Sequence, residues 1–195
     1  MKHLLITGFD PFGGASVNPS WEAVSRLPDT VGDYRLTKLQ IPTIFGVAAQ
    51  TVLAAAADAP DVILCVGQAG GRDAVTPERI AVNMASAKIP DNAGNQPVEM
   101  PILPGAPDGI FATVPVAAMA DAITAAGLPG KISNTAGTFV CNDTLYRLAH
   151  HFSGTSVRVG FIHVPWLPEQ AKEGAPSMPP VDIIAALTAA IGVLG

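Results

Sequence analysis

The amino-acid sequence predicts a single α/β domain, an α/β/α sandwich with a mainly parallel central sheet. Short apolar runs alternate with longer segments of helical character, which is the pattern of parallel strands joined by helices. The run DVILCV, residues 61–66, is apolar almost throughout, as in a strand that is buried on both faces. The length of 195 residues suits one domain, spanning 1–195, and no repeat or linker interrupts it.

The expected elements follow one another in a regular order. Asn18 suits the N-cap of the first helix because Pro19 then takes the first helical position. Strands are expected at 3–7, 34–41, 61–66, 79–85, 131–134 and 157–164, and helices at 19–27, 43–57, 116–126, 138–152 and 181–193.

Three stretches are expected to be functional loops. They are GFDPFGG (8–14), GQAGGR (67–72) and the Pro-, Gly- and Asn-rich segment 90–107. Ligands of open α/β sheets bind beyond the carboxyl ends of the strands. The first two loops, and the turn before residue 141, each follow an expected strand, so we expect them to meet at one rim.

Charge and composition exclude several classes of function. The formal net charge is −5, and the eleven basic residues form no cluster, so neither nucleic acid nor an anionic membrane is an expected partner. No apolar stretch has the length of a membrane span, and the N-terminus does not resemble a signal peptide, so a cytoplasmic location is expected. No metal site and no cofactor are expected, because the two cysteines have no neighbouring ligands at suitable spacing.

Cys141 is the candidate nucleophile. It is expected in the first turn of a helix that follows a strand and a turn, where free N–H groups and the helix dipole favour a thiolate and can hold an oxyanion. The alternative is a core cysteine, because Leu145, Leu148 and Phe152 share its helical face. Cys65, inside the run DVILCV, is expected to be core.

His163 is the candidate base, because it ends an expected strand at the rim, just before Pro165. A satisfied core histidine is the alternative. His3 begins the first expected strand, and His150 and His151 are expected at the surface. Glu78 could orient the imidazole, or it could be an exposed residue paired with Arg79. Four other carboxylates compete for that position: Asp10, Glu22, Asp91 and Glu169.

Seven blocks along the chain resemble those of the pyroglutamyl peptidase I family, also called pyrrolidone-carboxylate peptidases. In order they are GFDPFGG, NPSWEAV, VGQAGGR, TPERIAVN, IPDNAGNQP, SNTAGTFVCN and GFIHVPWLPEQ, and together they reach from about residue 6 to residue 170. The resemblance implies a cysteine exopeptidase that removes N-terminal pyroglutamate from peptides and that assembles as a homotetramer.

The resemblance also implies roles for individual residues. The family's nucleophile, histidine and acidic residue match Cys141, His163 and Glu78, and its substrate contacts match Phe9, Phe12, Gln68 and Phe139. Aromatic residues suit pyroglutamate, a lactam without a free amine or a charged side chain, because a charged amine would be costly to bury in the same pocket.

The chain departs from the family pattern at a few positions. Lys88 stands where the family has an arginine near the oxyanion region, and lysine keeps the charge but loses the planar guanidinium. Asp10 replaces a usual Glu, Trp166 a usual Tyr, and the connection 151–160 is shorter than usual.

Two other functions stay open on sequence alone. Lys88 leaves room for a binding protein on the same fold whose catalytic activity is weakened. GQAGGR could instead bind a phosphate, although neither G-x-G-x-x-G nor a P-loop pattern is present.

Overall fold

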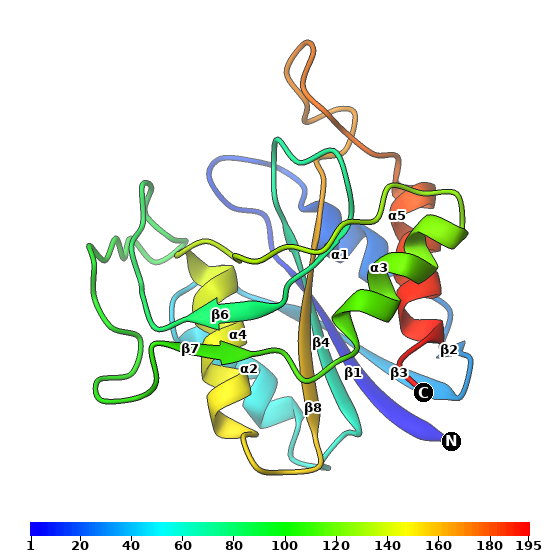
Figure 1. Cartoon of the computed structure of the whole chain (residues 1–195). Helices are drawn as coiled ribbons and strands as arrows, with labels where there is room; N and C mark the ends of the chain where they lie inside the picture. Colours follow the sequence, from blue (N-terminus) through cyan, green and yellow to red (C-terminus); the bar gives the residue numbers. More distant parts are fainter.

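A computed structural model describes residues 1–195 and contains the expected mainly parallel sheet (Figure 1). Six strands pair in the order β2-β3-β1-β4-β8-β5. The inner strands, all parallel, are β1 (Lys2–Phe9), β3 (Tyr34–Ile41), β4 (Val62–Gln68) and β8 (Arg158–Val164). Short antiparallel strands form the edges: β2 (Thr30–Val31) beside β3 and β5 (Thr76–Pro77) beside β8.

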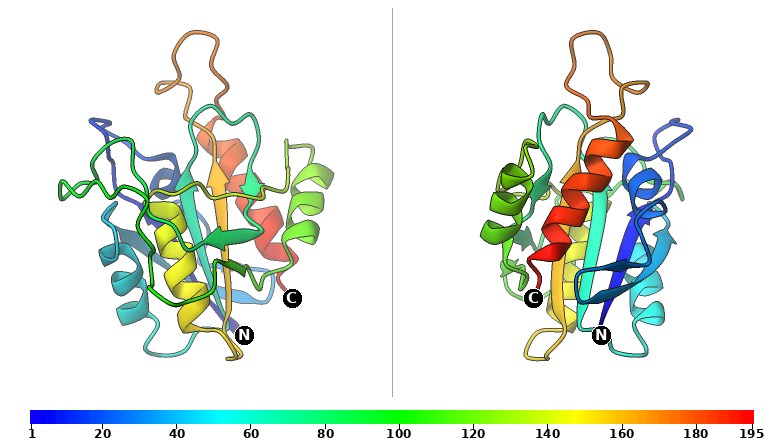
Figure 2. Two further views of the ribbon diagram at one scale, coloured as in Figure 1. Left: turned by 60° about the vertical axis from the view of Figure 1, so that its left-hand side comes forward. Right: turned by 90° about the vertical axis from the view of Figure 1, so that its right-hand side faces the viewer.

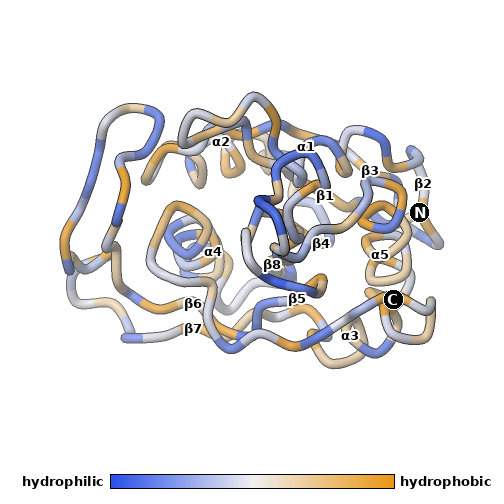
Figure 3. The backbone as a smooth tube through the Cα atoms, turned by 90° about the horizontal axis from the view of Figure 1, so that it is seen from above, coloured by the Kyte–Doolittle hydropathy of each residue, from blue (hydrophilic) through white to orange (hydrophobic).

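Helices cover both faces of this sheet, which confirms the α/β/α arrangement. One face carries α1 (Pro19–Val24), α3 (Val116–Ala125) and α5 (Pro180–Gly192), and the other carries α2 (Val47–Ala55) and α4 (Val140–His151). Figure 3, a view from above, shows α4 on one side of the strands and α3 and α5 on the other. A separate two-stranded sheet, β6 (Ile80–Val82) with β7 (Gly109–Phe111), lies beside α4 (Figure 1).

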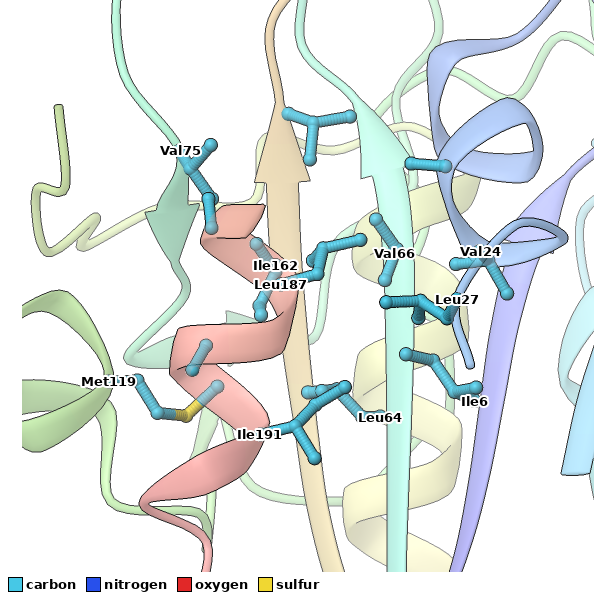
Figure 4. Packing of buried hydrophobic residues seen from close by; sticks show 14 of the residues in the cluster. Ile6, Val24, Leu27, Leu64, Val66, Val75, Met119, Ile162, Leu187 and Ile191 are labelled. Atoms are coloured by element: carbon cyan, nitrogen blue, oxygen red, sulfur yellow. The ribbon is translucent and has the colours of Figure 1, made fainter. Parts of the chain in front are cut away.

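Two apolar clusters hold the layers together, one on each side of the sheet. In the larger cluster, strand residues such as Leu64 and Ile162 pack against Leu187 and Ile191 of α5 (Figure 4). The smaller cluster joins the opposite strand face to α2 and α4 and contains Cys65, which is fully buried as expected. Since alternate residues of each inner strand enter opposite clusters, the continuous apolar runs of the sequence are explained.

Two expected strands differ in the structure. The segment 131–134 is not a strand, because it pairs only through an isolated bridge between Ser133 and Glu78, the residue that follows the two-residue β5. The expected strand 79–85 is shortened to β6 and pairs with β7 outside the main sheet. Sequence patterns did not indicate β2, β5 or β7, whose two or three residues are too few to show a periodicity.

The loops that follow β1 and β4 rise together above the carboxyl ends of the parallel strands, as expected, and the loop that follows β8 rises beside them (Figure 2). Loop 90–107 contains no helix or strand, and Asn92 donates hydrogen bonds to Asp10 and to the carbonyl oxygen of Pro11 in the first loop. None of the five helices combines the length and the apolar character that crossing a bilayer requires.

Gly8 lets α1 sit directly on β1, and its replacement is expected to destabilise the fold. A Cβ atom at Gly8 would lie 2.7 Å from the Trp21 Cα and 2.8 Å from the Ser20 carbonyl carbon, both backbone atoms that cannot turn aside. We expect Gly8→Ala to lower the free energy of unfolding by about 2–3 kcal/mol in urea denaturation. Gly192→Ala is the matched control, since nothing lies within 4 Å of its added Cβ. Equal stability of the two variants would contradict the close approach.

Candidate active site

The first turn of α4 holds Cys141 at the rim of the sheet. Phe139 is the N-cap and supplies no side-chain acceptor, so the first N–H groups of the helix stay free. The two residues after Cys141 anchor this first helical turn to neighbouring segments of the chain. Asn142, fully buried, bonds to the backbone of Val82 and Met84, while Asp143 accepts from the N–H of Gly46 and from Arg147.

Gly67 of β4 makes room for the thiol beside the sheet. Its register partner in β8 is His163, so both residues lie at the carboxyl ends of adjacent parallel strands. A Cβ atom built on Gly67 would lie 2.9 Å from the Cys141 Sγ. The sulfur therefore rests almost against the backbone of β4, next to the strand that carries His163.

His163 is paired with Glu78 at the end of the sheet. The His163 Nδ1 lies 2.7 Å from the Glu78 Oε1, and both side chains are buried, with 4% and 0% of their surfaces exposed. A carboxylate only accepts, so Nδ1 carries the hydrogen and Nε2 is the nitrogen left to exchange a proton. Strand β5 produces this contact, because Thr76 pairs with His163 and places Glu78 two residues further on.

The other carboxylates do not reach the imidazole. Asp91 accepts backbone N–H groups of its own loop and of Phe45, and Asp10 accepts from the N–H of Thr43. Glu22 pairs with Arg26 on the surface of α1, and Glu169 is exposed. Glu78 is thus the one carboxylate that contacts His163.

Arg72 is a member of the site that sequence reasoning missed. Its guanidinium donates to Glu78 Oε1 at 2.6 Å and to the carbonyl oxygen of Thr135 at 3.0 Å. Arg79, the partner considered for Glu78, instead donates to Asn134. The only sequence signal for Arg72 was its place in the loop GQAGGR, because nothing in the local pattern reveals which way the chain folds back.

A cavity of about 230 Å³ joins these groups. Its lining combines the reactive side chains with aromatic ones: Phe9, Phe12, Gln68, Arg72, Phe139, Cys141 and His163, together with Asn18, Thr43, Ala69 and residues 135–137. The rings of Phe12 and Phe139 are 5.9 Å apart, and Phe45 meets Phe139 edge to face at 5.3 Å. Six of the eight residues named from the sequence therefore line this cavity, together with Arg72. The seventh, Glu78, lies just behind His163.

Lys88 is the predicted residue that neither lines the cavity nor contacts a residue that does. Its side chain is exposed and makes no hydrogen bond or ion pair. The adjacent Ile89 lines a neighbouring cavity. His150 and His151 are exposed near the end of α4, as expected.

Desolvation dominates the electrostatics of the thiol. Burial, followed by the negative charge of Glu78, raises the pKa of Cys141 to about 12, although Arg72 opposes this shift. The expectation that the helix start would lower this pKa is therefore wrong, because the free N–H groups do not offset the loss of water. At neutral pH the resting side chain is a thiol.

Burial also lowers the pKa of His163 below its usual value, although the hydrogen bond and charge of Glu78 oppose this. Burial alone would raise the pKa of Glu78, but the hydrogen bond and charge of His163, aided by Arg72, outweigh it and hold that pKa below its usual value. At neutral pH the pair is a neutral imidazole beside a carboxylate.

Comparison with known families agrees with this site. The family model described as pyroglutamyl peptidase matches residues 2–195. The chain is 52% identical to the pyrrolidone-carboxylate peptidase of Levilactobacillus brevis, covering 96% of this chain and 95% of that protein. It is 49% identical to the enzyme of the same name from Staphylococcus aureus strain Newman, covering 97% and 92%.

Solved structures show the same likeness. Pyroglutamyl peptidase I of Bacillus amyloliquefaciens superposes with a TM-score of 0.96 at 44% identity, covering 100% of this chain and 97% of that one. The pyrrolidone carboxyl peptidase of Thermococcus litoralis gives 0.94 at 34% identity, covering 100% and 93%.

The protonation state of His163 can be measured directly. We expect nitrogen-15 NMR of labelled histidine to show a neutral ring with its proton on Nδ1 at pH 7, because burial favours the uncharged form. The signal is assigned by its loss in His163→Gln. A doubly protonated ring at pH 7, or a proton on Nε2, would contradict the arrangement with Glu78.

Proposed function

Because this chain belongs to the pyroglutamyl peptidase family, we propose that it is a cysteine exopeptidase with Cys141 as nucleophile, His163 as base and acid, and Glu78 as the residue that orients His163. The family hydrolyses the bond after an N-terminal pyroglutamyl residue, so the substrates are peptides blocked in this way. The observation that carries the proposal is the buried 2.7 Å contact of His163 Nδ1 with Glu78, in a site that also holds Cys141.

The resting groups suit a general-base mechanism. As the Cys141 sulfur attacks the pyroglutamyl carbonyl carbon, its proton passes to the His163 Nε2, since Nδ1 is engaged with Glu78. The carbonyl oxygen becomes an oxyanion, and the free N–H groups of the first turn of α4 stabilise it. No hydrogen bond joins Cys141 to His163 in the free protein, and such contacts commonly tighten when substrate binds.

The second half of the reaction restores the thiol. The C–N bond breaks as His163 gives its proton to the leaving amine, and a thioester remains on Cys141. Water then attacks this thioester, its proton passing to His163. The C–S bond breaks, the sulfur takes the proton back, and pyroglutamate leaves. Glu78 stabilises the imidazolium in both steps because it is held ionised beside Nδ1.

The aromatic lining explains selection of a cyclised terminus. Phe9, Phe12 and Phe139 surround the cavity with apolar surface, and their rings offer no counterion for an amine. A glutamyl or glutaminyl terminus carries an ammonium group, whose unpaired burial costs several kcal/mol. The lactam of pyroglutamate has no such charge, and Gln68 supplies a polar group for it.

Three further expectations stay part of the proposal. A cytoplasmic location suits a free thiol, because reducing compartments protect it. The homotetramer rests on the family resemblance. Assistance to the oxyanion by Lys88 requires this exposed side chain to swing toward the cavity when substrate binds, and the weakened binding protein is the alternative if no hydrolysis occurs.

The function is tested with a fluorogenic pyroglutamyl amide. We expect the wild type to hydrolyse it and Cys141→Ser to lose roughly 10³-fold or more in kcat, because a hydroxyl is a far poorer nucleophile at this site. Prolyl and glutamyl amides are the substrate controls. Folded, reduced wild type without hydrolysis would refute the exopeptidase and favour the weakened binding protein, with Lys88→Arg as the variant that then tests recovery.

The pH profile distinguishes a thiol from a preformed thiolate. We expect kcat/KM to rise with pH through a midpoint below 6.5, the usual value for histidine, as His163 loses its proton and becomes able to act as a base. We expect no loss near pH 9, the usual value for a thiol, because the pKa of Cys141 is raised to about 12. A decline centred near pH 9 would show that the thiol is not desolvated in the free enzyme.

A further inference from the structure

The guanidinium of Arg72 joins the loop after β4 to two other segments of the chain. Its Nη1 donates to the Oε1 of Glu78 at 2.6 Å and to the hydroxyl of Thr76, while its Nη2 donates to the carbonyl oxygen of Thr135 at 3.0 Å. Thr76 lies in β5 and Glu78 directly follows it, whereas Thr135 precedes α4. Because the guanidinium is planar and its donors form a fixed fork, the three acceptors hold it in one orientation.

Arg72 and His163 share one oxygen of Glu78. The His163 Nδ1 lies 2.7 Å from the same Oε1, and the carboxylate is fully buried while the Arg72 side chain is 28% exposed. The two thiols nearby, Cys141 of α4 and Cys65 of β4, are uncharged at neutral pH because burial raises the pKa of each to about 12. The charge on the shared oxygen is therefore divided between an imidazole and a guanidinium.

Glu78 and Arg72 are the charged groups that act on His163, and they act in opposite directions. The hydrogen bond and charge of Glu78 raise the pKa of the ring, whereas the charge of Arg72 lowers it. On the outer side of Arg72, Asp73 and Lys131 form an exposed ion pair with each other. Since the charges of that pair offset each other, one carboxylate and one guanidinium set the balance at His163.

We infer that Arg72 is a positioning residue, which holds the Glu78 carboxylate against the imidazole and offsets its charge so that His163 rests as a neutral base. The inference rests on the proposed function and adds a residue to it. A protonated ring cannot take the thiol proton of Cys141, and a buried carboxylate without a second partner favours the protonated ring. Arg72 acts through Glu78 and His163, not on the reacting atoms.

The central variant is Arg72→Gln, which removes the charge but keeps a polar side chain. We expect the rise of kcat/KM with pH to move to a higher midpoint, because His163 then keeps its proton to higher pH. On the alkaline plateau we expect kcat/KM to fall roughly tenfold or more, because the carboxylate loses a donor that orients it. Arg79→Gln is the matched control, since Arg79 is exposed and donates to Asn134.

Arg72→Lys separates the charge from the geometry. An ammonium group keeps the charge but lacks the planar fork that reaches Glu78 and Thr135 together. We expect the midpoint to stay near that of the wild type while the plateau falls roughly threefold or more. Circular dichroism checks the fold of each variant. If Arg72→Gln does not fold, Arg72→Lys still decides, because a wild-type plateau in this variant would refute positioning by the guanidinium.

Nitrogen-15 NMR of labelled histidine follows the His163 ring without catalysis. We expect its titration to move to higher pH in Arg72→Gln and to stay in place in Arg72→Lys and Arg79→Gln. If the wild type hydrolyses the pyroglutamyl amide but Arg72→Gln leaves the NMR titration and the kinetic midpoint unchanged, the role of Arg72 is refuted alone, even if the plateau falls. If the folded wild type does not hydrolyse this amide, both proposals fail.

Discussion

The carboxylate of Glu78 is the group around which the site is organised, because a buried negative charge must be paired and hydrogen bonded to be tolerated. The ring of His163 and the guanidinium of Arg72 both contact its Oε1, while the Oε2 has no partner. The backbone N–H of Glu78 donates to the carbonyl oxygen of Phe161, which joins this segment to β8. One contact network therefore fixes the imidazole, the loop after β4 and the edge of the sheet.

The position of Cys141 depends on a second set of buried polar groups. Asn142 uses both ends of its amide on the backbone of β6 and the residues beside it, and Asp143 holds the loop before α2. Asp91 accepts the N–H of Phe45 from the same loop, and the Phe45 ring supports Phe139. These buried polar residues thus fix the positions of the Cys141 sulfur and of the Phe45 and Phe139 rings. The cavity therefore has its shape before any ligand binds.

Much of this structure could be predicted from the sequence, for identifiable reasons. The inner strands and the long helices carry strong apolar patterns, and Asn18 with Pro19 marks the start of α1. The short edge strand β5 has no pattern, and it is β5 that brings Glu78 to His163. Contacts between distant loops, such as Gln170 with Gln68, leave no local signal. The raised pKa of Cys141 follows from desolvation, which depends on tertiary packing and not on the helix start alone.

The raised pKa of the Cys141 thiol determines when negative charge develops in the proposed mechanism. A resting thiolate would already attract the free N–H groups of α4 and the charge of Arg72, so part of their stabilisation would be used in the free enzyme. With Cys141 protonated and His163 neutral, the negative charge of the resting site is the Glu78 carboxylate, which is already paired with Arg72. In the proposed mechanism, negative charge then appears at the helix start only as the carbonyl oxygen becomes an oxyanion. Stabilisation present in the transition state and absent from the ground state is what accelerates a reaction. In the proposed mechanism, the desolvation that disfavours the thiolate therefore reserves the helix N–H groups for the chemical step.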